Sequence, residues 1–323
     1  MEEALVIGID VGGQSTKIGV IDIQGNIKAQ SVISSLQEDI NSYMEDLTKA
    51  IKALIAKTGK ISQFKGIGIG APNGNYYKGT IDSAPNLKWA HDPQGNPLEI
   101  QLSEMIKDQI GLPTVVTNDA NAAAVGEMTY GAAKGMKNFI MITLGTGVGS
   151  GIVIDGKVVY GHDGFAGELG HTTIIRDGRQ CACGKKGCLE TYTSAMGVAR
   201  TAKEKLNNSS IPSILRDIDI DSISSKDVYD AAKKGDKLAI EIFDYTAKLL
   251  GQAFADFVAF SAPEAIVLFG GLARSKEFLE EPILKYMNEN LLGIWKNKIQ
   301  LKFSLLKDSD AAILGAGALA WDL

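Results

Sequence analysis

The sequence predicts an α/β protein with mixed sheets, built from two related halves. Short apolar strands alternate with helical patterns along most of the 323 residues, and this alternation is typical of α/β architectures. A strand, a glycine turn and a second strand occupy Ala4–Ile27, and the same plan recurs at Phe139–Val159. Each copy also ends in a turn, at Gln24–Asn26 and at Asp155–Gly156. A repeated unit of this kind argues for two related halves.

The elements between and after these hairpins follow from periodicity and turn residues. In the first half we expect helices around Tyr43–Lys57, Leu98–Ile110 and Ala120–Glu127, and strands near Gly66–Ala71 and at Thr114–Thr117. In the second half we expect helices at roughly 191–206, 226–234 and 237–260, a strand at 265–269, a helix after Ser275, a strand at 299–306 and a helix from Asp310. The stretch 207–225 has no regular pattern. We expect a small lobe at 1–118, with the C-terminal helix (about 310–323) packed back on it, and a larger lobe at 119–309.

Composition excludes several classes of protein. The net charge of −5 argues against a partner held through nucleic-acid phosphates. No segment approaches the roughly 18 uncharged apolar residues of a membrane span. The acidic start lacks the basic region of a secretory signal. We therefore expect a cytoplasmic protein with no nucleic-acid or membrane partner.

Two glycine turns are candidates for binding phosphate. The turn at Asp10–Lys17 lacks the spacing of a P-loop. Gly12 and Gly13 would still let backbone N–H groups approach a phosphate, together with the Ser15 and Thr16 hydroxyls, and Asp10 at a strand end would hold Mg²⁺ through water. The turn at Gly145–Gly147 in the second hairpin makes a matching pair. An ordinary glycine hairpin remains the alternative for the first turn.

A second group of polar residues lies at the junction of a strand and a helix. The strand ends at Thr117, and Asn118 and Asp119 come where the next helix begins. A carboxylate at such a junction is well placed to accept a proton from a substrate hydroxyl. Asp119 is equally well placed to be a helix N-cap.

The third group brackets the cysteines. Glu168 and His171 in "GELGH" are three residues apart and can point into one site, and Glu190 closes the motif "GCLE". These polar groups suit sugar hydroxyls. The alternatives are a solvated turn for Glu168 and His171, and a helix N-terminal charge for Glu190.

All three cysteines of the chain lie within eight residues, at Cys181, Cys183 and Cys188. Scattered cysteines would indicate core packing and paired ones disulfides. With His171, the nearest histidine, they supply three thiolates and one imidazole, a set common for structural zinc. The sequence therefore predicts a closed Zn²⁺ site that fixes the loop carrying Glu168 and Glu190.

Together these motifs resemble the ROK family of sugar kinases and repressors, and within it the bacterial glucokinase or hexokinase branch. The most specific element is G-E-x-G-H followed by C-x-C-G-x2-G-C-x-E. The resemblance implies a two-lobed, actin- and hexokinase-like (ribonuclease H-like) fold with ATP in the cleft between the lobes. It implies Asp119 as the general base and a homodimer. It implies sugar binding by Asn86, Asn118, Glu168, His171 and Glu190, and ATP binding by Asp10, Gly12, Gly13, Ser15, Thr16, Lys17, Gly145, Thr146, Gly147, Gly270 and Gly271.

The resemblance makes ATP-dependent phosphorylation of a hexose the leading function, with glucose at its 6-hydroxyl as the expected acceptor and mannose or an N-acetylhexosamine as other acceptors. Two positions depart from the family pattern: Gln14 replaces a common threonine, and Asn73 stands where many relatives have glycine. The alternative is a sugar-binding regulator without catalysis, which would need a DNA-binding segment before the first strand. A zinc-ribbon nucleic-acid module and a non-catalytic chaperone or filament protein fit the motifs less well.

Overall fold

A computed structural model describes residues 3–323, which group into two compact units. Unit 1 contains the chain up to Met136, together with Gly151–Gly167 and Leu305–Leu323. Unit 2 contains Lys137–Ser150 and Glu168–Ser304. Residues 119–136 and 151–167 thus group with unit 1, whereas the sequence analysis placed them in the larger lobe. The lobe boundary itself stays a prediction.

A five-stranded sheet forms the centre of unit 1. Its strands lie in the order β3 (Ile27–Ser34), β2 (Ser15–Asp22), β1 (Leu5–Val11), β4 (Phe64–Gly70) and β8 (Thr114–Thr117). β1 pairs with β2 in antiparallel and with β4 in parallel register, so the sheet is mixed, as predicted. The sequence analysis did not predict β3. This strand lies at the sheet edge and buries few of its residues, so its polar sequence gives little strand signal.

A second, small sheet in unit 1 corrects one predicted helix. Its strands are β5 (Gly74–Asn75), β6 (Thr80–Asp82) and β7 (Glu99–Ile100). The helix expected from Leu98 begins only at Leu102, as α2 (Leu102–Ile110), because Ile100 is paired with Ile81 of β6. Strands of two or three residues are too short to show a period in the sequence.

Helices cover the main sheet of unit 1. They are α1 (Ile40–Thr58), α2, α3 (Asp119–Tyr130) and α9 (Asp308–Ala318). α1 begins where Asp39 accepts hydrogen bonds from the N–H groups of Asn41 and Ser42, an N-cap that satisfies two free donors of the first turn. Its buried face, which includes Leu47 and Ile51, joins the β-strand side chains in one apolar core.

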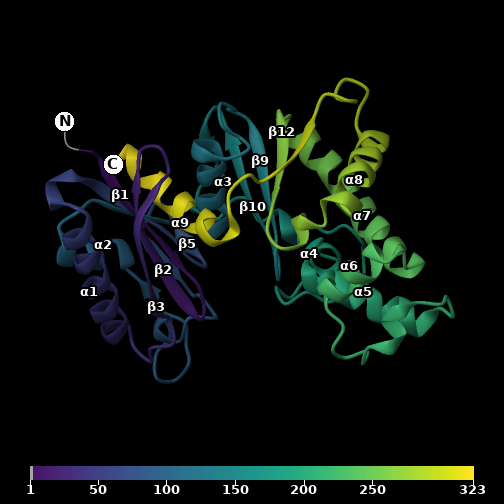
Figure 1. Cartoon of the computed structure of the whole chain (residues 1–323), viewed down its shortest axis with the longest axis horizontal. Helices are drawn as coiled ribbons and strands as arrows, with labels where there is room; N and C mark the ends of the chain where they lie inside the picture. Colours follow the sequence, from purple (N-terminus) through teal and green to yellow (C-terminus); the bar gives the residue numbers. More distant parts are fainter. Residues whose placement is uncertain (1–2) are drawn as a thin grey trace. The chain divides into compact units, whose positions relative to one another are not determined.

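The C-terminal helix α9 packs directly against the sheet formed by the N-terminal strands (Figure 1). Gly8 in β1 and Gly68 in β4 make this approach possible, because a Cβ atom at either position would overlap a carbonyl oxygen of α9, that of Ile313 or Ala316. The predicted return of the C-terminal helix to the N-terminal sheet is therefore seen within unit 1.

Unit 2 is built on a parallel core of three strands. The second five-stranded sheet has the order β11 (Lys157–Val158), β10 (Val148–Ile154), β9 (Phe139–Leu144), β12 (Ala265–Phe269) and β13 (Gln300–Phe303). β12 pairs in parallel with both β9 and β13. Residues 151–154 of β10 and the whole of β11 belong to unit 1. The predicted strands at 139 and 265–269 are confirmed, and the one predicted at 299–306 ends earlier, at Phe303.

The helices of unit 2 are α4 (Glu190–Thr193), α5 (Ala195–Asn208), α6 (Ser225–Lys233), α7 (Lys237–Ser261) and α8 (Lys276–Asn290). The single helix expected at 191–206 is two helices, because Ser194 is extended and caps α5 by accepting from the Gly197 N–H group. Within 209–224 the regular structure is one short 3₁₀ turn, Ile214–Asp217, in line with the absence of a pattern there.

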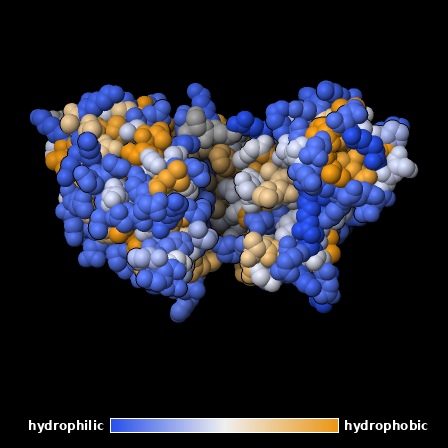
Figure 2. All heavy atoms as spheres, turned by 90° about the horizontal axis from the view of Figure 1, so that it is seen from below, coloured by the Kyte–Doolittle hydropathy of each residue, from blue (hydrophilic) through white to orange (hydrophobic). Residues whose placement is uncertain are grey.

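None of the helices in residues 3–323 combines the length and apolar composition needed to cross a bilayer. The face seen in Figure 2 is mostly hydrophilic, with separate apolar patches.

Replacing Gly68 with alanine tests the contact between α9 and the sheet. The added methyl group would overlap the Ala316 carbonyl, and such overpacking costs roughly 1–3 kcal/mol. We expect Gly68→Ala to lower the melting temperature measured by calorimetry. Gly293→Ala is the control, because a Cβ there meets no atom within 4 Å. Equal melting temperatures for the two variants would contradict the packing of α9 described above.

Candidate functional site

The glycine turn of unit 1 lies against Asn86. The Gly12 N–H group donates to the Ser15 carbonyl at 3.1 Å and closes the turn between β1 and β2. A Cβ atom on Gly13 would lie 3.2 Å from the Asn86 carbonyl oxygen and 3.3 Å from its Nδ2 atom. A predicted phosphate-loop residue and a predicted sugar-binding residue therefore meet at this turn.

Asp10 and Asp119 also lie close enough to interact. Asp10 is half-buried at the end of β1 and stands opposite Lys17 of β2. Burial raises the pKa of Asp10 to about 6, with Lys17 opposing the shift and the negative charge of Asp119 adding to it. A buried carboxyl group whose proton affinity is raised by a second carboxylate is a favourable place for a bound cation or a transferable proton.

The start of α3 shows which residue is the N-cap of this helix. The N-cap is Asn118, whose Oδ1 atom accepts from the Asn121 N–H group at 2.7 Å. Asp119 is the next residue, and its Oδ1 atom accepts from the adjacent Ala120 N–H group at 2.8 Å. The Asp119 side chain keeps contact with solvent, while the surrounding protein displaces enough water to raise its pKa. The interpretation of Asp119 as the N-cap is wrong.

Thr16 does not fit the role predicted for it. The side chain is fully buried, and hydrogen bonds of 2.8 Å join its hydroxyl to Ser35 Oγ and to the Tyr43 hydroxyl. Alternation along β2 turns Thr16 toward the core, so the prediction that its hydroxyl reaches a phosphate is not supported. Ser15, the preceding residue, is half-buried and points to the other face.

The glycine loop of unit 2 is held by its neighbours. The Gly145 N–H group donates to the Gly147 carbonyl at 3.0 Å, and the Gly145 carbonyl accepts from the Ala195 N–H group at 2.8 Å. Gly270 lies beside the same loop: it has a φ of 102°, and a Cβ there would lie 2.7 Å from the Leu144 carbonyl. Gly145, Gly147 and Gly270 are thus brought together at the ends of β9 and β12, whereas Gly271 adjoins open space.

His171, Cys181, Cys183 and Cys188 converge on one point. One ligand atom from each lies within 4.8 Å of all the others. The Cys181 Sγ atom is 3.6 Å from His171 Nδ1, and the Cys183 and Cys188 Sγ atoms are 3.7 Å apart. Tetrahedral zinc with bonds of about 2.3 Å would separate its ligands by about 3.8 Å. The donor set and its spacing therefore fit a four-coordinate metal.

The three thiols differ in their surroundings. Burial raises the pKa of the Cys188 thiol to about 12 and also raises that of Cys181. The backbone N–H group of Lys185 stabilises the Cys183 thiolate and lowers its pKa. Two buried thiols that hold their protons need a cation to become thiolates.

The ring of His171 faces the cysteines on one side and Glu168 on the other. Its Nε2 atom is 3.9 Å from Glu168 Oε2, a distance too long for a direct hydrogen bond. The carbonyl of His171 accepts from the Lys185 Nζ group at 2.7 Å. Lys185, a basic side chain of the cysteine loop, is therefore bound within the loop itself.

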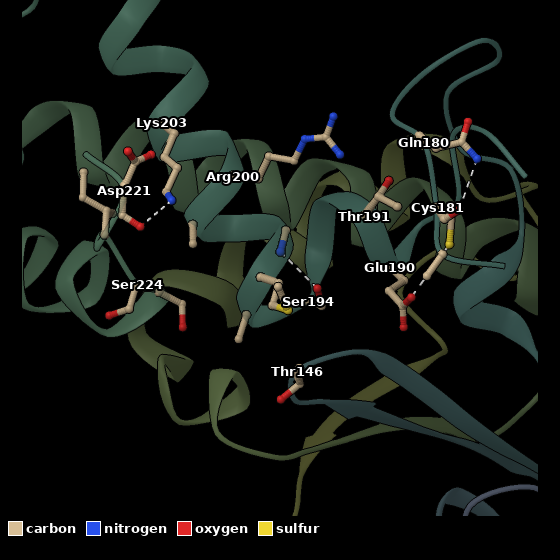
Figure 3. Close-up of a pocket in the computed structure, with 17 residues that line it drawn as sticks. Thr146, Gln180, Cys181, Glu190, Thr191, Ser194, Arg200, Lys203, Asp221 and Ser224 are labelled. Atoms are coloured by element: carbon tan, nitrogen blue, oxygen red, sulfur yellow. Dashed lines mark hydrogen bonds between the residues drawn. The ribbon is translucent and has the colours of Figure 1, made fainter. Parts of the chain in front are cut away.

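Glu190 lies between the cysteine cluster and the glycine loop. Figure 3 shows its carboxylate flanked by Cys181 and by the loop that carries Thr146. The Glu190 Oε2 atom accepts from the Val148 N–H group at 2.9 Å, and the Oε1 atom is 3.9 Å from Cys181 Sγ. Glu190 is the first residue of α4, so its helix N-terminal position and its contacts with the site are both observed.

A pocket of about 630 Å³ opens beside the same loop. Thr146 and Glu190 line one end, and residues of α5 and of the loop before α6 line the rest (Figure 3), among them Met196, Arg200, Lys203, Asp221 and Ser224. Its volume falls in the range of small-molecule sites. The sequence analysis missed this pocket because its lining comes from segments more than 70 residues apart, from Thr146 to Ser225.

Arg179 is a further residue that the sequence did not single out. Its side chain is buried and donates to the carbonyl of Thr191, the hydroxyl of Thr201 and the carboxylate of Glu204. It thereby ties the start of the cysteine loop to α4 and α5. An arginine two residues before the first cysteine is the only local signal of this role.

Asn73, the departure from the family glycine, adopts a φ of 52°. Its Nδ2 group donates to the carbonyls of Asp82 and Ser83 at 3.0 and 3.1 Å. The amide therefore closes the loop that carries β5 and β6. Asparagine tolerates this left-handed conformation better than other side chains do.

Comparison with known proteins gives one family across the chain. The model described as "ROK family" matches residues 6–322. A glucokinase of Halalkalibacterium halodurans is 35% identical over 99% of this chain and 96% of its own length. A glucokinase of Streptomyces griseus solved with glucose and AMPPNP is 32% identical, with a TM-score of 0.77, over 99% of this chain and 100% of that one. A xylose repressor of Caldicellulosiruptor bescii is 29% identical over 97% of this chain and 77% of its own length.

The environment of Asp10 predicts a pH-dependent gain in stability on its removal. The pKa of this carboxyl group rises from 3.8 to about 6 on folding, so its protonated form favours the folded state. Its contribution to the free energy of unfolding is therefore lost as the pH rises from about 4 to about 6. Asp10→Asn should therefore raise the free energy of unfolding of the ligand-free protein at pH 7, by up to about 3 kcal/mol. Urea titration should show that this gain disappears near pH 4. An equal change in the free energy of unfolding at both pH values would contradict the raised pKa of Asp10.

Proposed function

Because this chain belongs to the ROK family, we propose that it transfers the γ-phosphoryl group of ATP to the 6-hydroxyl of glucose. The O6–P bond forms as the bond between the γ-phosphorus and the β–γ bridging oxygen breaks, and that oxygen keeps the electron pair as ADP leaves. The proton of the hydroxyl passes to the protein. The observation that carries the proposal is the Asp119 carboxylate, solvent-accessible at the start of α3 and raised in pKa.

Asp119 is the proposed general base. A base works best when its pKa lies near the operating pH, because it is then ionised yet able to take a proton. The displacement of water around Asp119 raises its pKa and so moves it in that direction. Asn118 caps the helix and fixes the backbone from which Asp119 projects, and we propose that it also contacts the sugar.

The site is proposed to use Mg²⁺, held through water by Asp10. The pair of mutually repelling carboxylates in unit 1 supports this choice, because a divalent cation would relieve their repulsion. When bound, Mg²⁺ neutralises charge on the phosphates. The turn contains the small residues Gly12, Gly13 and Ser15, and this supports its assignment to the phosphates. The nearby cation is Lys17, which pairs with Asp10 across β1 and β2.

ATP is proposed to bind unit 2 at the loop Gly145–Gly147 and in the adjoining pocket. The pocket volume of about 630 Å³ suits a nucleoside. Thr146, which lines this pocket, would meet the phosphates. Gly270, which lies beside the Leu144 carbonyl at the start of the loop, and Gly271 are proposed as further contacts of the nucleotide. The AMPPNP bound by the relative from Streptomyces griseus supports ATP as the donor.

Within unit 1, Asn86 and Asn118 are proposed as sugar-binding residues. Within unit 2, the proposed sugar-binding residues are Glu168, His171 and Glu190. The 3.9 Å separation of His171 Nε2 from Glu168 Oε2 is one that a shared sugar hydroxyl would span. The glucose bound by the relative from Streptomyces griseus supports glucose as the acceptor. Mannose and N-acetylhexosamines stay as further acceptors for the assay below.

The cysteine cluster is proposed to hold one structural Zn²⁺. Four protein ligands would leave no open position, so the ion would shape the loop and would not act on the phosphates. The convergence of four ligand atoms within 4.8 Å supports this. His171 would bind through Nδ1, which faces Cys181, and leave Nε2 for the sugar side.

The alternative function is a sugar-binding regulator without catalysis, and the match to the xylose repressor supports it. Both functions share the sugar site, so sugar binding alone does not separate them. ADP formation does. We also propose that the protein is a cytoplasmic homodimer. Light scattering of the purified protein measures its mass and so tests whether it is a dimer.

Asp119→Asn should retain the fold but lose turnover. Removing a general base lowers the rate by about 10²- to 10⁴-fold. The measurement is ADP formation, coupled to NADH oxidation, with a panel of hexoses at saturating ATP. Asp108→Asn is the control, because Asp108 is an exposed residue of α2. Absence of sugar-dependent ADP formation in the wild-type protein would favour the regulator, and a near-normal rate in Asp119→Asn would remove Asp119 as the base.

Elemental analysis should find about one zinc per chain. Cys183→Ser should abolish it, because a serine hydroxyl is a poor ligand for this borderline-soft ion. Lys186→Ala, which alters an exposed side chain of the same loop, should keep the metal. Freshly purified, active protein with no zinc would refute the structural metal.

A further inference from the structure

The hairpin formed by residues 145–150 is held by the segment that carries His171. The Leu169 N–H group donates to Ser150 Oγ at 3.1 Å. Gly170 lies so close to Val148 that a Cβ atom on Gly170 would overlap the Val148 carbonyl. One strand of the hairpin is therefore packed directly against the turn that leads into the first ligand of the cysteine cluster.

Glu190 contacts the same hairpin from the side of the cysteines. Its Oε2 atom accepts from the Val148 N–H group, and a Cβ atom on Gly147 would overlap that same oxygen. Its Oε1 atom faces Cys181 Sγ at 3.9 Å. The carboxylate therefore contacts the glycine loop with one oxygen and the metal-ligand cluster with the other (Figure 3).

The backbone of Glu190 is fixed by its neighbours in the cysteine loop. Cys188 precedes it by two residues, and the Cys188 carbonyl accepts from both the N–H group and the hydroxyl of Thr191, at 3.0 and 2.7 Å. The Leu189 N–H group donates to the Thr172 carbonyl at 2.9 Å. A metal bound by Cys188 and His171 would clamp both of these segments and so fix where the Glu190 side chain begins.

The contact between Cys181 and Glu190 belongs to the same geometry. The Cys181 Sγ atom lies 3.9 Å from Glu190 Oε1 and 3.6 Å from His171 Nδ1. A metal held by Cys181 and His171 would therefore fix the side chain that adjoins the Glu190 carboxylate, while the Val148 N–H group donates to the other carboxylate oxygen.

We propose that Glu190 is a positioning residue that couples the cysteine and histidine cluster to the glycine loop, so that metal occupancy sets the affinity of unit 2 for nucleotide. The proposal rests on the proposed function, because that function assigns the loop to the phosphates of ATP. The sequence analysis connects the metal site only with the loop that carries Glu168 and Glu190. Here the same metal site is connected with nucleotide binding as well. Coupling between two sites is reciprocal, so bound nucleotide must also retain the metal.

The test measures how much zinc the zinc-loaded protein releases to a chromophoric chelator at equilibrium, with and without ADP and with no sugar present. ADP binding to the loaded and the zinc-depleted protein is measured separately by calorimetry. For the wild type we expect ADP to raise the zinc affinity about fivefold or more, which lowers the zinc release, and zinc to tighten ADP binding by the same factor. Neither readout depends on turnover.

Four variants locate the coupling. Glu190→Ala removes the hydrogen bond to Val148 and should abolish the effect of ADP on zinc release, while all four metal ligands remain. Glu190→Gln keeps an acceptor for that bond and should restore most of the effect. Gly147→Ala pushes on the Glu190 carboxylate from the loop side and should also uncouple the sites, even where Glu190→Ala fails to fold. Lys186→Ala is the matched control within the cysteine loop and should behave as the wild type.

Unchanged zinc release in wild-type protein that binds ADP would overturn the coupling. Wild-type coupling in both Glu190→Ala and Gly147→Ala would overturn the role of Glu190. Failure of the wild type to bind ADP at all would instead refute the proposed kinase function, and this proposal with it.

Discussion

The carboxylate of Glu190 joins the glycine loop of unit 2 to the cysteine loop. It occupies the space that a side chain at residue 147 would need, accepts a hydrogen bond from the Val148 N–H group, and lies beside Cys181. Gly147 is therefore a glycine because of its neighbour and not because of an unusual backbone angle. The cysteine loop, which the metal is proposed to hold, thereby supports the loop proposed to receive the phosphates.

The candidate site of unit 1 contains a carboxyl group that resists ionisation. Burial raises the pKa of Asp10, and the negative charge of Asp119 raises it further. Such a pair weakens the ligand-free protein, and proteins keep strained groups of this kind where function requires them. A cation and a substrate proton are the partners that would relieve the strain, and phosphoryl transfer to a hydroxyl uses both.

The sequence predicted the features that depend on residue type and on neighbours along the chain. The four cluster ligands were recognisable because thiols and imidazoles at short spacing have few other uses, and the alternation of strands and helices identified the α/β class. Thr16 was misassigned because a hydroxyl beside a glycine turn resembles a phosphate ligand, whereas its place in β2 turns it into the core. The roles of Asn118 and Asp119 became distinct only with side-chain positions. The bond between Glu190 and Val148 joins residues 42 positions apart, which no local pattern can indicate.

The central claim is that the metal cluster holds the glycine loop, and hydrogen exchange of individual amides tests it most directly. Exchange is compared in the zinc-loaded and the zinc-depleted protein without nucleotide. We predict that depletion accelerates exchange of the Val148 and Leu169 amides, which donate to Glu190 and Ser150, while the amides of β12 keep their protection. Equal exchange at Val148 and Leu169 in the two forms would contradict the account.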